Sequence, residues 1–286
     1  TIRGKITKEE IENLKNGVTI DGYKTSKAKI RILKTDEEKK KAKEVIDELG
    51  MKVASYSITN NFVCDEETRL QQVEMVKNAC QTAHYYNTDT IRVFCGDLKE
   101  GYDFDKAFDL IVKSFKECVK VAEKENIYFC LENHGKLAGK SKQIEAVIRA
   151  VNSKHLKITA DTGNFLLVGE NPLEAIQYLK NDIGLVHFKD FLLVDKEHVQ
   201  YYGLDGIYTR GVVLTKGDVP LKEIIAFLMY QIEGKKYYGY QIYNSGTADI
   251  TYNLERRAVE YAREHYGVNS SYAWTEIGNL GANKRA

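Results

Sequence analysis

Two spacings of apolar residues alternate along the chain. Where apolar side chains recur every three or four positions they form one face of a helix, and the segment 104–125 carries the clearest stripe of this kind. This spacing predicts helices over 8–16, 36–49, 66–86, 104–125, 141–152, 172–181, 218–232 and 249–265. Two helix starts place a capping residue ahead of a first-turn proline, in Asn171-Pro172 and in Asp218-Val219-Pro220.

Short runs rich in β-branched and aromatic residues separate these helices. They predict strands over 18–23, 52–59, 90–95, 127–133, 156–161, 184–188 and 237–243. Strands that alternate with helices indicate a parallel sheet with helices outside, and 286 residues suit a (β/α)8 TIM barrel, which typically needs ~250. The pattern contains seven strands, because none precedes the first helix. Either that strand lies upstream of Thr1, or the polar N-terminus supplies a weak one, or the interpretation of 18–34 is wrong.

The predicted barrel is one domain over residues 1–266. Residues 191–216 interrupt its rhythm as a long insertion after the sixth counted strand, and long insertions of this kind often form active-site loops. The segment 267–286 is a polar C-terminal tail that holds the only tryptophan, Trp274. We expect this tail to serve contacts with another subunit, either in a homo-oligomer or in a complex with a small partner chain.

Composition narrows the classes of partner. The 42 basic and 41 acidic residues give a net charge of +1 and are spread evenly, which predicts neither nucleic-acid nor membrane binding. No apolar run approaches the ~18 residues of a membrane helix, and the first residues do not resemble a signal peptide. The 5 cysteines form no CxxC pair, so we expect reduced thiols in a cytoplasmic protein.

Metal-ligand side chains stand at the C-terminal ends of four predicted strands. The four segments are Cys130-Leu131-Glu132-Asn133-His134-Gly135, Thr159-Ala160-Asp161-Thr162-Gly163-Asn164, Leu185-Val186-His187-Phe188-Lys189-Asp190 and Tyr240-Gln241-Ile242-Tyr243-Asn244. In a parallel barrel all strands open at their C-terminal ends onto one mouth, so ligands far apart in sequence can meet at one ion. Taken singly, each polar strand end is more often a structural or solvated residue; it is their occurrence together that predicts a metal site.

Side-chain alternation along a strand assigns these residues to faces. The pairs that share a face are Glu132 with His134, His187 with Lys189, and Gln241 with Tyr243. The side chains predicted to surround a cation at the mouth are Glu132, Asp161, His187 and Gln241. Two carboxylates, an imidazole and an amide oxygen suit Mn²⁺ best, with Mg²⁺, Co²⁺ and Zn²⁺ as alternatives. The absence of thiolates from this set argues against a closed structural zinc site.

With these motifs in view, the chain resembles the xylose isomerase-like TIM-barrel superfamily, the sugar phosphate isomerases and epimerases. The resemblance runs from about residue 8 to residue 266. The segments that carry it are Leu131-Glu132-Asn133-His134-Gly135, Asp161-Thr162-Gly163-Asn164, Val186-His187-Phe188-Lys189-Asp190 and Gly217-Asp218-Val219-Pro220-Leu221. The resemblance implies that Glu132, Asp161 and His187 are metal ligands. It also implies a strand ahead of the helix predicted at 8–16.

One position departs from the family pattern. The family usually supplies a second glutamate from the last strand, and the best-aligned residue here is Gln241, with Asn244 as an alternative occupant. An amide oxygen can bind a cation, but an amide cannot act as a base at neutral pH. The chain therefore lacks the pair of glutamates that work on opposite faces of the substrate in the family's ketose epimerases.

We predict catalytic roles for Glu132, His134 and Lys189. Glu132 could remove a substrate proton while bound to the metal, whereas His134 is the better free base because an imidazole titrates near neutral pH. His134 could equally orient Glu132. Lys189 could donate to a developing oxygen, and its alternative is an ion pair with Asp190 or simple solvation. The predicted substrate hydrogen-bonders are Asn164 and Tyr243.

The leading hypothesis is a divalent-metal-dependent sugar isomerase or epimerase in carbohydrate metabolism. It would act on a ketose or oxo-sugar by proton abstraction next to a metal-bound carbonyl, through an enediolate. The first alternative is a lyase that uses the same enolisation, such as a dehydratase or the catalytic subunit of a C-glycoside deglycosidase acting on 3-oxo-glycosides, which works with a small partner chain. The second is a sugar-binding barrel without catalysis.

Overall fold

The computed structural model describes residues 18–20, 23–25, 36–48, 53–99, 101–232 and 240–242. The predicted helices at 8–16 and 249–265, the tail at 267–286 and Tyr243 lie outside these residues. Within them, no helix is both long enough and apolar enough to span a membrane.

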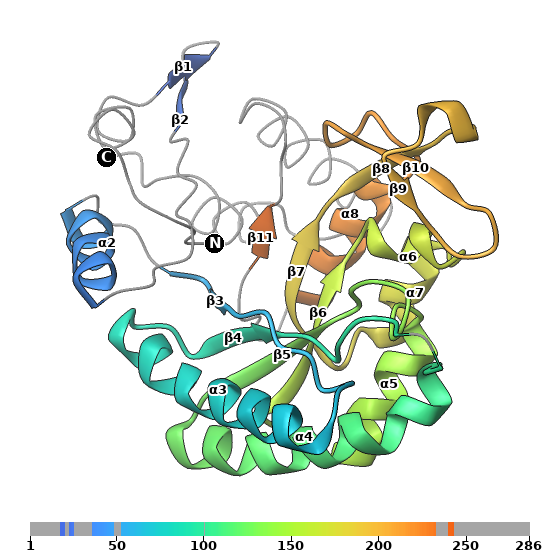
Figure 1. Cartoon of the computed structure of the whole chain (residues 1–286). Coiled ribbons are helices and arrows are strands. Elements are labelled where there is room, and N and C mark those ends of the chain that lie inside the picture. The colour runs from blue at the N-terminus through green and yellow to red at the C-terminus, as the bar shows by residue number, and fades with distance from the viewer. Residues whose placement is uncertain are drawn as a thin grey trace.

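A curved six-stranded parallel sheet is the centre of the structure (Figure 1). Its order across the sheet is β11 (Tyr240–Ile242), β7 (Ile183–Phe188), β6 (Leu156–Asp161), β5 (Tyr128–Glu132), β4 (Thr90–Val93) and β3 (Tyr56–Ser57). All five neighbouring pairs are parallel, as the alternation of helices and strands predicts. Every residue of β4 and of β7 is buried, as is typical of strands in a parallel sheet covered by helices. The described strands and helices form part of a (β/α)8 barrel.

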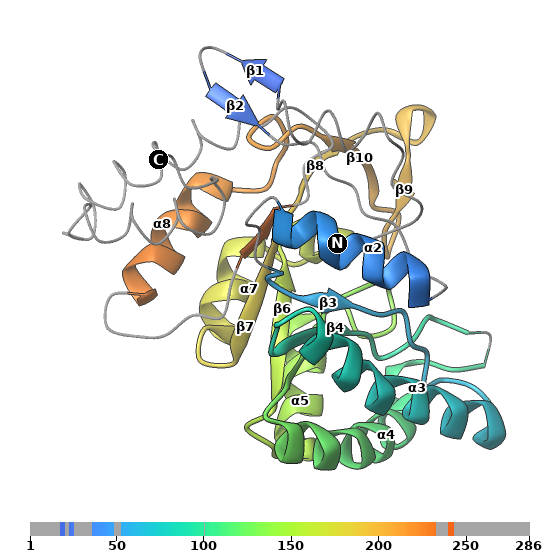
Figure 2. The same cartoon turned by 90° about the vertical axis from the view of Figure 1, so that its left-hand side faces the viewer.

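Among the helices, α3, α4 and α5 lie along the outer side of the sheet, where Figures 1 and 2 show them lined up. The bounds of the helices are α2 (Asp36–Glu48), α3 (Glu66–Tyr85), α4 (Phe104–Glu125), α5 (Ser141–Val151), α6 (Asn164–Leu167), α7 (Pro172–Leu179) and α8 (Leu221–Ile232). Helix α4 has the stripe that the sequence predicts: Ile111, Phe115 and Ala122 are fully buried against the sheet and α3. Local signals set the ends, as where Asn171 Oδ1 accepts from the backbone N–H groups of the first turn of α7.

The start of α8 differs from the prediction. The helix begins at Leu221 rather than at residue 218. Instead of capping it, the Asp218 carboxylate accepts a hydrogen bond from the backbone N–H of Leu193, at 2.7 Å. The Asp218 side chain, which the local sequence predicts as a helix cap, therefore binds the backbone of a residue distant in sequence.

The insertion after β7 contains its own antiparallel sheet, where the sequence predicts only a long loop. Its strands, in the order β8, β10, β9, are β8 (Asp190–Leu193), β10 (Tyr208–Val212) and β9 (Tyr201–Tyr202), with the short 3-10 helix η1 (Lys196–His198) between β8 and β9. The turn from β9 to β10 contains Asp205 and Gly206 at φ 52° and 80°, a backbone conformation that these residue types adopt readily. Figure 1 shows this sheet beyond the C-terminal end of β7.

The prediction of one parallel strand over 18–23 is wrong. Residues Val18–Ile20 (β1) and Tyr23–Thr25 (β2) form a separate two-stranded antiparallel sheet. Ile20 pairs with Tyr23, which leaves Asp21-Gly22 as a two-residue connection, and this dipeptide favours tight hairpins. The turn preference of Asp21-Gly22 therefore decides the structure here, rather than the β-branched residues from which a single strand was predicted.

Candidate metal and active site

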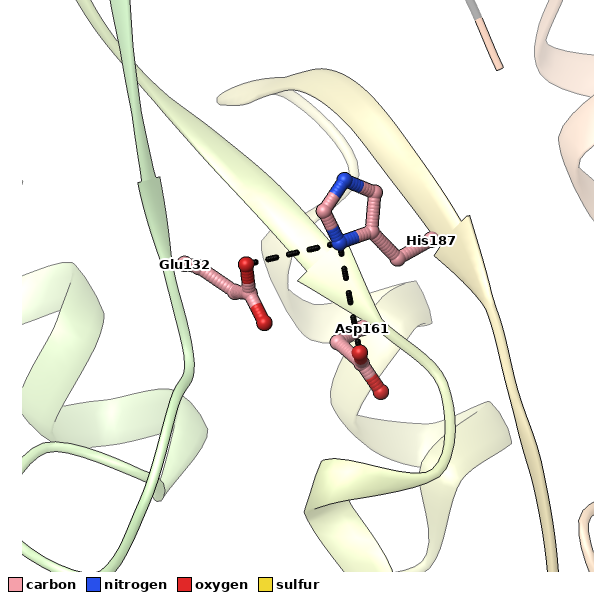
Figure 3. Close-up of side chains that lie close together, drawn as sticks. All are labelled: Glu132, Asp161 and His187. Atoms are coloured by element: carbon pink, nitrogen blue, oxygen red, sulfur yellow. Dashed lines mark ion pairs between the residues drawn. The ribbon is translucent and has the colours of Figure 1, made fainter. Parts of the chain in front are cut away.

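Three side chains predicted as metal ligands meet at the C-terminal ends of adjacent strands (Figure 3). Glu132 ends β5, Asp161 ends β6 and His187 is the fifth residue of β7, and Asp161 and His187 are direct partners in the register. His187 Nδ1 lies 3.4 Å from Glu132 Oε2 and 4.0 Å from Asp161 Oδ2. One ligand atom from each residue lies within 4.8 Å of the other two, and all three residues are buried.

Asp161 is held by the turn that follows β6. Its Oδ1 accepts from the backbone N–H groups of Gly163 and Asn164 at 3.1 and 3.0 Å, while Lys189 Nζ lies 2.9 Å from Oδ2. The Asn133 side chain donates to the Asp161 carbonyl and accepts from its N–H, which ties the end of β5 to the end of β6. One carboxylate oxygen is thus fixed to the backbone and the other is directed toward the cluster.

Glu132 is surrounded by donors and positive charge. Its Oε1 accepts from Asn164 Nδ2 at 3.3 Å, and Arg92 Nε lies 3.3 Å from Oε2, the oxygen that also faces His187. Burial alone would raise the pKa of Glu132, but the hydrogen bond from His187 and the charges of His187, Arg92 and Lys189 outweigh it and lower the pKa to about 2. Glu132 is therefore ionised at neutral pH.

Lys189 belongs to this cluster, and the alternative of an ion pair with Asp190 is wrong. Its Nζ also donates to Asn164 Oδ1 at 3.0 Å. The Asp190 carboxylate is occupied elsewhere, because it accepts from the backbone N–H groups of Gly217 and Val219 at 2.9 and 3.2 Å. The stem of Lys189 passes so close to Gly163 that a Cβ there would lie 2.9 Å from Lys189 Cγ. The glycine of this turn therefore makes room for the lysine.

His134 is exposed, and its ring packs on Phe94 with 4.4 Å between ring centroids. Its backbone N–H donates to the Glu132 carbonyl, but across the described ranges its side chain makes no hydrogen bond to the Glu132 carboxylate. The role of orienting Glu132 therefore has no contact to support it. The role of a free base stays a prediction.

A pocket of about 120 Å³ opens at this point. The residues that line it are Arg92, Phe94, Glu132, His134, Asp161, His187 and Lys189. The sequence interpretation assigned no role to Arg92 or Phe94. The sequence feature that could have identified them is the charged Arg92 within the apolar strand 90–95, followed two positions later by Phe94 on the same face.

The other predicted site residues stand differently. Asn164 is buried, and its amide bonds to both Glu132 and Lys189, so it cross-links the cluster, while its contact with substrate stays a prediction. Gln241 pairs with His187 in the register between β11 and β7. The Gln241 side chain and the whole of Tyr243 lie outside what the structure describes, so their predicted roles also stay predictions.

The two separations measured from His187 Nδ1 suit ligands of one divalent cation. Ligands 2.0–2.2 Å from one ion are about 3 Å apart when adjacent and about 4 Å apart when opposite. The separations of 3.4 and 4.0 Å from His187 Nδ1 fall within this range or at its limit. A set of two carboxylates and one imidazole suits Mg²⁺, Mn²⁺ or Zn²⁺. A cation held by these three residues would border the pocket, where substrate or water could reach it.

Fold and site define a parallel α/β barrel with a buried acidic and histidine cluster at the mouth. The family model of the xylose isomerase-like TIM barrel matches residues 16–241, and the chain belongs to this family. No curated protein matches the sequence.

Several solved structures share the fold. A D-tagatose 3-epimerase-like protein superimposes with a TM-score of 0.63 at 20% identity, covering 81% of this chain and 86% of that one. A xylose isomerase-like TIM barrel protein from Mycobacterium smegmatis in complex with magnesium gives 0.60 at 17%, covering 80% and 78%. The probable 3-DHS dehydratase AsbF from Bacillus anthracis gives 0.58 at 19%, covering 80% and 83%. At these identities the likeness is one of fold.

Proposed function

We propose that this protein is a divalent-metal-dependent enzyme of the sugar isomerase and epimerase type, acting on a ketose or oxo-sugar. The observation that carries the proposal is the meeting of Glu132, Asp161 and His187 at the barrel mouth, with ligand atoms within 4.8 Å of one another. Epimerase-like and magnesium-bound proteins among the structural relatives support the same class. Mn²⁺ is the cation we favour, because the donors are mostly oxygen and include one imidazole.

The metal ligands would be Glu132, Asp161 and His187, with Gln241 as a fourth from β11. A divalent cation held there would act as a Lewis acid and would stabilise negative charge developing on a substrate carbonyl oxygen. Glu132 suits the ligand role, since its carboxylate is buried in the cluster and faces His187 Nδ1 at 3.4 Å. His134 is exposed at the rim of the pocket and is the base we propose for the substrate α-proton.

Lys189 is the proposed proton donor. Its Nζ is held by Asp161 and Asn164, and the side chain also lines the pocket. A lysine fixed in this way can place a proton on an oxygen that gains charge, while its own charge offsets that of Asp161. The side chains of Asn164 and Tyr243 would complete the contacts to the sugar hydroxyl groups.

A lyase that uses the same enolisation is the second candidate. The observation that favours it is Gln241, which stands in register with His187 where the family usually supplies a glutamate. An amide cannot remove a proton, so epimerisation with a base on each face of the substrate lacks one base. Elimination needs only one base. The probable dehydratase among the relatives of the fold is consistent with this candidate.

The deciding experiment is a screen of ketoses and oxo-sugars by NMR in D₂O with the Mn²⁺-reconstituted protein, preceded by elemental analysis. Deuterium entering an unchanged carbon skeleton supports the isomerase, whereas release of a second product supports the lyase. Asp161→Asn should abolish either reaction, and Asp109→Asn, on an exposed position of α4, should leave it unchanged. If no divalent metal binds and no substrate exchanges, the proposal fails. Binding of a sugar without exchange would then favour a sugar-binding barrel without catalysis.

A further inference from the structure

Arg92 stands in the wall of the pocket as a buried cation. It lies on β4, only 2% of its surface is exposed, and it lines the pocket together with the carboxylate cluster. Burying a guanidinium is costly unless its N–H groups find acceptors, and an arginine side chain stays charged in proteins. The partners of its N–H groups therefore indicate what Arg92 does in the pocket.

Few of the N–H donors of the Arg92 guanidinium face an acceptor among the described residues. Its Nε lies 3.3 Å from Glu132 Oε2 but makes no well-aligned hydrogen bond, and the Glu132 carboxylate is shared with His187 and Asn164. The guanidinium carbon lies 4.2 Å from the centroid of the Phe94 ring, which covers one face of the group. Among the described residues, its two terminal nitrogens have no protein acceptor. The fork is thus held between Glu132 and Phe94, and the described part of the chain leaves its terminal donors to a ligand.

The balance of charge points the same way. Among the described lining residues, the charges of Arg92 and Lys189 offset those of Glu132 and Asp161. A divalent cation would bring an excess of two positive charges into a largely buried site. A ligand that carries its own negative charge offsets this excess, whereas a neutral sugar does not.

We propose that Arg92 is an anion-binding residue that selects substrates with a carboxylate group, so that the substrate is an oxo- or keto-sugar acid rather than a neutral sugar. The two terminal nitrogens of the guanidinium match the two oxygens of a carboxylate in a bidentate pair. The inference deepens the proposed function and rests on it for the reaction. The binding preference itself requires no metal, since the guanidinium supplies it.

The test compares D-gluconate with D-glucitol, which differ by a carboxylate against a hydroxymethyl group. Binding is followed by NMR titration of the full chain after removal of divalent metal, so that chelation by a metal cannot produce the preference. We expect gluconate to bind about 10- to 100-fold more tightly than glucitol, the range of a charge-assisted pair. Arg92→Gln should remove the preference, and Arg92→Lys should reduce it because the fork is lost. Arg149→Gln, at a largely exposed arginine on α5, should keep it.

Each outcome decides the matter. Equal binding of the two probes by the wild type overturns the inference, as does a preference that survives Arg92→Gln, which would assign it to Lys189. Should Arg92→Gln fail to fold, Arg92→Lys keeps a cation beside Glu132 and carries the test. Failure of the proposed function is recognised separately, by the absence of metal binding and of deuterium exchange.

Discussion

Substituting Gly163 by alanine tests whether Lys189 is held as tightly as the structure indicates. The Gly163 backbone, at φ −78° and ψ −30°, accepts any residue, so the change acts through space alone. The new Cβ would lie 2.9 and 3.0 Å from Cγ and Cδ of Lys189 and 3.0 Å from Cδ2 of Phe191. A free lysine would swing aside at little cost. This one must give up the contacts of Nζ with Asp161 and Asn164, at 2.9 and 3.0 Å.

The expected magnitude follows from two opposing effects. Overpacking costs about 1–3 kcal/mol, while alanine in a compatible backbone returns about 0.4–1 kcal/mol by restricting the unfolded chain. The mid-values of these ranges combine to about 1.3 kcal/mol, so we expect Gly163→Ala to lower the free energy of unfolding by this order, within about 0–2.6 kcal/mol, in urea denaturation. Displacement of the lysine should also lower kcat/KM for the proposed reaction by about 10- to 100-fold.

Gly211→Ala is the matched control, because a Cβ there would meet its nearest neighbour at 3.6 Å, an ordinary contact. It should leave activity unchanged. A second check is the Lys189→Ala background, in which Gly163→Ala should cost less than in the wild type, since the close contacts with Lys189 Cγ and Cδ are then absent. If Gly163→Ala is as stable and as active as Gly211→Ala, then Lys189 is not held by Asp161 and Asn164 and the reasoning about its role is refuted.

Three further predictions address the ligands and the connection beyond them. His187→Ala should weaken Mn²⁺ binding at least about 100-fold by calorimetry, and unchanged affinity would exclude His187 as a ligand. The folded pKa of Glu132, about 2, is below its ordinary 4.5, so Glu132 stabilises the metal-free fold above pH 4.5 and loses this contribution as pH falls toward 2. The free energies of unfolding of the wild type and Glu132→Gln, measured against pH, should therefore converge toward pH 2. Parallel curves would contradict the lowered pKa. Asp190→Ala leaves the N–H groups of Gly217 and Val219 without their acceptor and should cost about 1–3 kcal/mol in urea denaturation, whereas Asp190→Asn should cost less; equal stability of all three proteins would show that these bonds contribute nothing.

The local pattern of the sequence was sufficient for the parallel part of the barrel. The strand predicted over 156–161 has the same bounds as β6, and the helix predicted over 104–125 has those of α4. Both follow from periodicity and capping, which act within a few residues. The meeting of Glu132, Asp161 and His187 was also predictable, because parallel strands in one sheet end on the same side.

Contacts between distant segments decided the rest. Nothing in the neighbourhood of Lys189 indicates that it pairs with Asp161 rather than with the adjacent Asp190, since the choice depends on which backbone N–H groups fold back onto Asp190. The burial of Arg92 beside Glu132 depends on how β4 and β5 lie together in the sheet. The separate hairpin of β1 and β2 has a local signal, which competes with the β-branched run around it. Sequence periodicity determines which face of an element is apolar, but only tertiary packing determines which partner each polar side chain meets.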